Sequence, residues 1–127
     1  MNLRVKKLYL YLQKHPHIDI VQTSNLLKNP PFGYQFQDDF INGIMLIKTS
    51  LSPNQLLQQL LQIEKFFARK RSFANAPRTM DLDIIFFESK KMYNTHLTIP
   101  HPHWKERMSI LAPLHSLLQH LHKESRL

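Results

Sequence analysis

The sequence contains no cysteine and only two glycines among its 127 residues. The absence of cysteine excludes a disulfide framework and thiolate chemistry, and it favours a reducing, cytoplasmic location. Two glycines are too few for a Walker-type phosphate loop or a G-x-G-x-x-G dinucleotide loop. No apolar run is long enough to cross a bilayer, and residues 1–14 mix apolar with polar side chains, unlike the core of a signal peptide. We therefore expect no membrane partner.

Acidic residues are also scarce, because 9 Asp+Glu stand against 17 Lys+Arg, for a formal net charge of +8. Such a charge favours polyanionic partners, such as nucleotides, nucleic acid or anionic lipid, without choosing among them. With so few glycines, a phosphate site here must be built mainly from Arg, Lys, His and metal ions. The length suits a single domain over residues 1–127 with a modest hydrophobic core.

The spacing of apolar residues predicts a mixture of helices and strands. A helix is predicted over residues 2–14, ended by Pro16, and Ser52-Pro53 is typical of a second helix start. The other predicted elements are strands over 18–24, 40–48 and 80–87, an extended piece over 97–99, and a closing helix with Leu114, Leu117, Leu118 and Leu121. We interpret this order as an α/β (α+β) fold. The specific prediction is a ferredoxin-like sandwich with a mainly antiparallel sheet, helices on both faces and its first strand missing from this chain.

Two aspartates stand two residues apart in the predicted strand over 80–87. Residues at this spacing share one face of a strand and lie about 6.5 to 7 Å apart, so Asp81 and Asp83 are predicted to project side by side. Such a pair is suited to holding Mg²⁺ against a triphosphate during phosphoryl transfer. The alternative is that both carboxylates simply face solvent at a strand end.

Basic side chains gather in two other stretches. Residues 97–107 place His, Lys and Arg among prolines, and these groups suit phosphate oxygens and a leaving nucleotide. His101-Pro102-His103 also fits half of a metal site, and His15-Pro16-His17 repeats the pattern, but two ligands do not make a site. Arg69 and Arg71 are interpreted either as part of a mobile basic flap over phosphates or as a solvated helix end.

Sequence motifs follow one another in a recognisable order along nearly the whole chain. The most specific are P-R-T-x-D-L-D-I at residues 77–84 and T-I-P-H-P at residues 98–102. The others are Asn29-Pro30-Pro31-Phe32-Gly33, Asp39-Phe40-Ile41-Asn42, Glu64, Arg69 with Arg71, Arg107, and Pro113-Leu114. Together they resemble the 6-hydroxymethyl-7,8-dihydropterin pyrophosphokinase family. The combination is far more specific than D-x-D alone, and it favours the metal interpretation of the aspartates.

The resemblance implies a diphosphotransferase of folate biosynthesis that moves pyrophosphate from ATP to the hydroxymethyl group of the dihydropterin and releases AMP. It implies that Asp81 and Asp83 hold two Mg²⁺ ions. The implied catalytic residues are Arg69, Arg71 and Arg78, the implied ATP contacts are Glu64, Thr98, His101, Lys105 and Arg107, and the implied pterin contacts are Pro31, Phe32, Phe40 and Asn42. No nucleic-acid partner is implied, and a monomer is expected.

Three features depart from the family pattern. The opening strand and its G-S-N-x-G turn are expected just before Met1, so the chain is predicted to lack that strand. Ser109 stands where the family usually has a phenylalanine that stacks on the pterin, and Asn75-Ala76 replaces the usual Trp-Gly or Tyr-Gly. The missing strand and Ser109 motivate an alternative, a non-catalytic remnant that binds nucleotide or a protein partner. A basic RNA-binding module is a further alternative, but the sequence lacks the aromatic cluster of an RNP motif.

Overall fold

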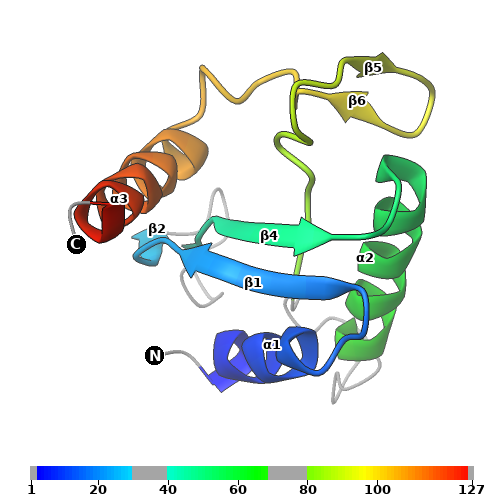
Figure 1. The fold of residues 1–127 in the computed structure, drawn as a ribbon, viewed down its shortest axis with the longest axis horizontal. Coiled ribbons are helices and arrows are strands. Elements are labelled where there is room, and N and C mark those ends of the chain that lie inside the picture. The colour runs from blue at the N-terminus through cyan, green and yellow to red at the C-terminus, as the bar shows by residue number, and fades with distance from the viewer. Residues whose placement is uncertain (1–2, 30–39, 69–79, 126–127) are drawn as a thin grey trace. The chain divides into compact units, whose positions relative to one another are not determined.

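The computed structural model describes residues 3–29, 40–68 and 80–125. They belong to two compact units, a first unit of residues 1–50 with 105–127 and a second unit of residues 51–104. Both units contain helix and antiparallel strand pairs, which confirms the mixed helix-and-sheet class predicted from the sequence (Figure 1). Among the described helices, none combines the length and the apolar character needed to cross a bilayer.

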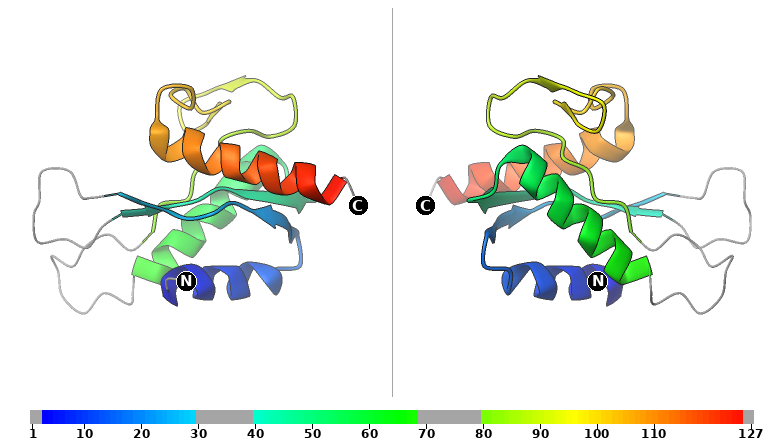
Figure 2. Two further views of the ribbon diagram at one scale, coloured as in Figure 1. Left: turned by 90° about the vertical axis from the view of Figure 1, so that its left-hand side faces the viewer. Right: turned by 90° about the vertical axis from the view of Figure 1, so that its right-hand side faces the viewer.

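The first unit is built on two antiparallel strand pairs. β1 (Ile18–Thr23) pairs with β4 (Met45–Thr49), and β2 (Leu27–Asn29) pairs with β3 (Phe40–Asn42). The helices α1 (Leu3–Gln13) and α3 (Met108–Ser125) both contact β1, and Figure 2 shows them on opposite sides of the strands. The buried apolar side chains of this unit include Leu8, Leu12, Ile18, Ile110 and Leu117.

The single strand predicted over residues 40–48 is wrong, because the chain forms two strands with a break at Gly43 and Ile44. There the buried Ser24 hydroxyl accepts the Ile44 N–H at 2.8 Å, and the Ser24 N–H donates to the Ile44 carbonyl oxygen at 2.8 Å. A side chain thus replaces one backbone partner of the ladder. The two segments approach closely, since a Cβ atom at Gly43 would lie 2.8 Å from Leu26 Cδ2. Apolar composition predicts extended backbone, but it does not locate such a break.

The two helices of the first unit agree with the sequence to different degrees. The helix predicted over residues 2–14 is confirmed as α1. The closing helix is longer than its leucine pattern indicated, because α3 begins at Met108 and continues through Pro113. The Asn25 N–H donates to the Ser116 hydroxyl at 2.8 Å, which attaches α3 to the chain between β1 and β2.

The second unit contains α2 (Pro53–Ala68) and a hairpin of β5 (Met92–Tyr93) and β6 (Thr98–Ile99). A capping box begins α2, in which Ser52 Oγ accepts the Gln55 N–H at 3.2 Å and Gln55 Oε1 accepts the Ser52 N–H at 2.9 Å. The predicted helix start is therefore confirmed. The buried side chains of α2 include Leu56, Ile63 and Phe67.

The strand predicted over residues 80–87 is wrong in one respect. The segment alternates between exposed Asp81 and Asp83 and the less exposed Leu82 and Ile84, as a strand does, but it pairs with no strand among the described residues. The alternation of exposed and less exposed residues indicates that one side of the segment faces the interior. A strand also requires a hydrogen-bonding neighbour, which a local pattern does not identify.

Candidate functional site

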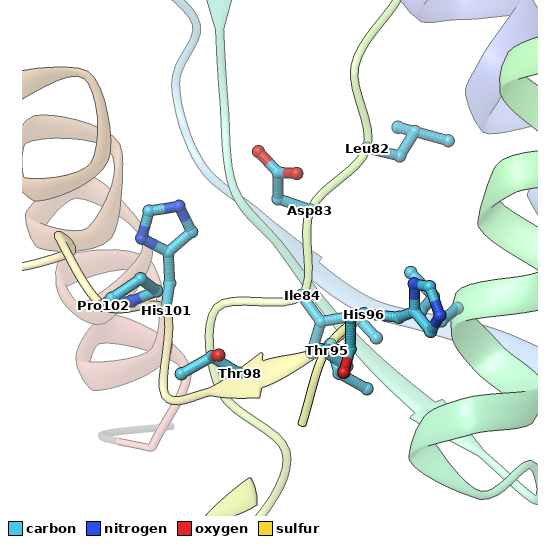
Figure 3. Close-up of a pocket in the computed structure, with 10 residues that line it drawn as sticks. Leu82, Asp83, Ile84, Thr95, His96, Thr98, His101 and Pro102 are labelled. Atoms are coloured by element: carbon cyan, nitrogen blue, oxygen red, sulfur yellow. The ribbon is translucent and has the colours of Figure 1, made fainter. Parts of the chain in front are cut away.

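A pocket of about 260 Å³ lies in the second unit. Its walls come from α2, from residues 82–84 and from residues 95–102 (Figure 3). The lining residues are Leu57, Leu82, Asp83, Ile84, Thr95, His96, Leu97, Thr98, His101 and Pro102. Apolar walls with a few convergent polar groups are typical of small-molecule sites, and this volume is slightly below their usual range of about 300 to 1,000 Å³. The pocket therefore suits one part of a larger ligand, such as a heterocycle or a phosphate group.

The two aspartates of the D-x-D motif are both exposed, and Asp83 lines the pocket. Figure 3 shows the Asp83 carboxylate on the same side of residues 82–84 as the His101 ring. Among the described residues, no group of three or more His, Cys, Asp or Glu converges as a metal-ligand set. Two carboxylates still fit Mg²⁺, because this ion commonly takes one or two carboxylates and completes its shell with water and substrate phosphates. Asp81 and Asp83 are the candidate ligands.

His101 is held in place through its backbone and its ring. Its N–H donates to the Ile85 carbonyl oxygen at 2.8 Å, and its ring Nδ1 accepts the His103 N–H at 3.1 Å. When Nδ1 is an acceptor, the neutral ring carries its hydrogen on Nε2. His101 therefore has an Nε2–H donor to offer to a ligand in the pocket that it lines.

The two His-Pro-His stretches form the same local turn. In each, the Nδ1 of the first histidine accepts the N–H of the second at 3.1 Å, with ring centroids 6.1 Å apart for His15 and His17 and 6.2 Å apart for His101 and His103. Neither stretch belongs to a cluster of three or more possible metal ligands in the described part of the chain. The hydrogen bond within each turn explains why its two histidine rings lie close together, and no metal ion between them is needed to explain it.

Glu64 acts on the same segment from α2. Its Oε1 atom accepts the backbone N–H of Leu82 at 2.8 Å, between the two aspartates in sequence. Glu64 is half-buried and is not among the residues that line the pocket. The structure thus brings Asp83, Thr98 and His101 around one pocket and connects Glu64 to them through the backbone of Leu82.

Of the other predicted site residues that the structure describes, Asn42, Lys105 and Arg107 are not among the residues that line this pocket. Asn42 is half-buried in β3 of the first unit, where it makes no side-chain hydrogen bond to another described residue, and Lys105 and Arg107 are exposed in that unit. The side chain of Phe40 is outside the described part of the structure. The same holds for the whole of Pro31, Phe32, Arg69, Arg71 and Arg78.

Sequence reasoning missed several residues that line the pocket. Leu57 belongs to no sequence motif, although it directly follows Leu56, a buried residue of α2. Thr95 and His96 also lie outside the motifs. One signal was available, because Asn94 is a typical turn former. Its side-chain oxygen accepts the N–H groups of His96 at 3.1 Å and Leu97 at 2.8 Å, which places these residues at the turn between β5 and β6.

Comparison with known proteins identifies the family. Residues 2–119 match the family described as 7,8-dihydro-6-hydroxymethylpterin-pyrophosphokinase. The chain is 42% identical over 112 residues to the 2-amino-4-hydroxy-6-hydroxymethyldihydropteridine pyrophosphokinase of Helicobacter pylori, covering 87% of this chain and 69% of that protein. The protein of the same name from Campylobacter jejuni is 41% identical over 111 residues (87% and 71%), and that from Bacillus subtilis is 38% identical over 114 residues (90% and 68%). The chain belongs to this pyrophosphokinase family, which confirms the resemblance seen in its motifs.

Proposed function

We propose that this protein transfers pyrophosphate from ATP to 6-hydroxymethyl-7,8-dihydropterin and releases AMP, the diphosphokinase step of folate biosynthesis. The observation that carries the proposal is the family match over residues 2–119. The arrangement of Asp83, Thr98 and His101 around one pocket supports it, because a carboxylate, a hydroxyl and an imidazole N–H are groups that bind a metal–nucleotide complex.

In the proposed reaction, the hydroxymethyl oxygen of the pterin attacks the β-phosphorus of ATP. The bond from that phosphorus to the oxygen bridging to the α-phosphate breaks, AMP leaves with the electron pair, and the hydroxyl proton passes to solvent. This chemistry requires positioning and charge neutralisation more than covalent help from the protein. Bound Mg²⁺ supplies neutralisation of the triphosphate charge.

The roles of individual residues are part of the proposal. Asp81 and Asp83 hold Mg²⁺, two ions in the arrangement that the family resemblance implies. Thr98 and His101 bind the nucleotide through their hydroxyl and Nε2–H groups. Arg69, Arg71 and Arg78 as catalytic residues, Lys105 and Arg107 on the nucleotide, and Pro31, Phe32, Phe40 and Asn42 around the pterin stay predictions. So do the ferredoxin-like arrangement, the single domain, the monomeric state and the cytoplasmic location.

The test is AMP release by the purified chain supplied with ATP, Mg²⁺ and the dihydropterin, with a pterin-free reaction as the background. We expect pterin-dependent AMP and an equimolar pyrophosphorylated pterin by mass spectrometry. AMP no higher than the pterin-free background would overturn the proposal, and ATP binding without turnover in calorimetry would then favour the non-catalytic alternative.

The matched variants are Asp83→Asn and Asp19→Asn. Both remove one exposed carboxylate, but Asp19 lies in β1 of the first unit. We expect Asp83→Asn to abolish AMP release while its circular dichroism spectrum is unchanged, and Asp19→Asn to keep wild-type turnover. Wild-type turnover by Asp83→Asn would count against the metal role of Asp83.

A further inference from the structure

The hydrogen bond from Leu82 N–H to Glu64 joins α2 to the D-x-D segment. The donor and acceptor atoms are 2.8 Å apart, and the bond is partly buried. A single side chain on a regular helix therefore holds the backbone at the position between Asp81 and Asp83.

This bond fixes the backbone of a segment that no described strand supports. Residues 80–87 belong to no strand pair in the described part of the chain. The carbonyl oxygen of Ile85 accepts the His101 N–H, which anchors the segment on the far side of Asp83. The Glu64 bond holds it at Leu82, beside Asp81.

The geometry of the peptide group explains how Glu64 acts on the aspartates. The N–H of Leu82 lies in the same rigid plane as the carbonyl group of Asp81. Fixing the direction of that N–H fixes the tilt of the plane, and with it the directions in which the flanking side chains leave the backbone. Two carboxylates bind one cation well only when their directions are set in advance, since outer-shell partners commonly change metal affinity by about 10- to 100-fold.

We infer that Glu64 is a positioning residue: its carboxylate orients the Asp81–Asp83 pair for a divalent cation through the Leu82 N–H, instead of contacting the nucleotide. The inference rests on the proposed function. It differs from the nucleotide contact that the family resemblance implied for Glu64, and it agrees with the absence of Glu64 from the pocket lining.

The experiment measures AMP release against Mg²⁺ concentration for Glu64→Ala, Glu64→Gln and Glu64→Asp. Gln keeps an acceptor oxygen at the same reach, whereas Asp keeps the charge but is one methylene too short. We expect Ala and Asp to raise the half-saturating Mg²⁺ concentration by about tenfold or more. We expect Gln to remain within about threefold of wild type, and the KM for ATP at saturating Mg²⁺ to be nearly unchanged in all three variants. Gln62→Ala, an exposed position on the same helix, is the control and should match wild type.

Three results would overturn the inference. The first is an unchanged Mg²⁺ dependence in folded Glu64→Ala, or in Glu64→Asp where the Ala variant does not fold. The second is a Gln variant as impaired as the Ala variant, which points to the charge and not to the acceptor. The third is a raised KM for ATP without any change in Mg²⁺ dependence, which points to direct nucleotide contact.

A separate readout distinguishes this inference from the proposed function. If the wild-type chain releases no AMP, the function fails, but amide hydrogen exchange at Leu82 still tests the hydrogen bond, and Mg²⁺ titration by NMR still tests its effect on the aspartates. We expect faster Leu82 exchange and weaker Mg²⁺ binding in Glu64→Ala and Glu64→Asp, and values near wild type in Glu64→Gln. Equal exchange and equal Mg²⁺ binding in all of these proteins would overturn the inference without reference to turnover.

Discussion

The backbone N–H of His101 donates a hydrogen bond to the carbonyl oxygen of Ile85, 2.8 Å away. This bond joins the two motifs that are most specific to the family, because Ile85 directly follows the D-L-D-I run and His101 lies in T-I-P-H-P. The aspartate segment and the histidine turn are therefore fixed to each other through the backbone. Side-chain substitutions at His101 leave this bond possible, so they test the ring alone.

The ring of His101 has two separable tasks. Asn at this position keeps an acceptor near the place of Nδ1 for the His103 N–H but has no donor at the place of Nε2. We expect His101→Asn to weaken ATP binding about 2- to 10-fold in calorimetry, the value of one net hydrogen bond, with an unchanged melting temperature. His101→Ala should show the same weakening and also a lower melting temperature. Wild-type ATP affinity in His101→Asn would exclude the predicted donor.

Ser24 holds the break between β3 and β4. Because its buried hydroxyl accepts the Ile44 N–H, Ser24→Ala leaves that donor without a partner. We expect the free energy of unfolding in urea to fall by about 1 to 3 kcal/mol. Ser50→Ala is the control, since the Ser50 hydroxyl is exposed and its hydrogen bond is with the exposed His17 ring. We expect this variant to change the free energy of unfolding by less than about 0.5 kcal/mol. Equal losses in the two variants would contradict the role assigned to Ser24.

Glu88 adopts the left-handed backbone region, with φ at 53°. A residue with a Cβ atom is strained there by about 1 to 2 kcal/mol, whereas Gly is not, although Gly loses more backbone entropy on folding. We expect Glu88→Gly to raise the free energy of unfolding by about 0.5 to 1 kcal/mol in urea titrations. The neighbouring turn residue Ser89 has no positive φ, so Ser89→Gly should lower stability. A less stable Glu88→Gly would show that the turn needs the Glu88 side chain.

The raised pKa of Tyr9 predicts that the free energy of unfolding falls at alkaline pH. Burial raises the pKa of its phenol above the ordinary value of 10.0, and the hydrogen bond with Thr23 offsets this only in part. The folded state therefore holds the phenol proton more tightly than the unfolded state. The stabilisation that this gives the folded state is complete below pH 10 and is lost as pH rises through the folded pKa of Tyr9. We expect the stability of wild type relative to Tyr9→Phe to decline above pH 10 in urea titrations. A constant difference from about pH 9 to 11 would contradict the raised pKa.

Local patterns predicted the elements whose signals are local. The start of α2 was predictable because Ser52 and Gln55 complete a capping box within one turn, and α1 ends close to where Pro16 indicated. Strand pairing was predicted less well. The break at Gly43 depends on the hydroxyl of Ser24, which directly follows β1, and residues 80–87 have strand-like alternation but pair with no strand among the residues that the structure describes.

The candidate site shows the same division. Asp83, Thr98 and His101 were all selected from sequence motifs, and all three line the pocket. Their residue types indicated metal and phosphate binding, and the order and spacing of the motifs indicated the family. The apolar walls, Leu57 and Leu97 among them, carry no chemical signal, since a leucine on a pocket wall looks like any other leucine in the sequence.

The sequence by itself determined the family, the reaction class and the candidate residues for metal and phosphate binding, because these depend on side-chain chemistry in a fixed order. Only the tertiary structure decided that Glu64 holds the backbone between the two aspartates and that His101 is bonded to Ile85. Both contacts join segments far apart in sequence. Their existence depends on how a helix, an extended segment and a turn pack together, and that packing is not encoded in any local pattern of residues.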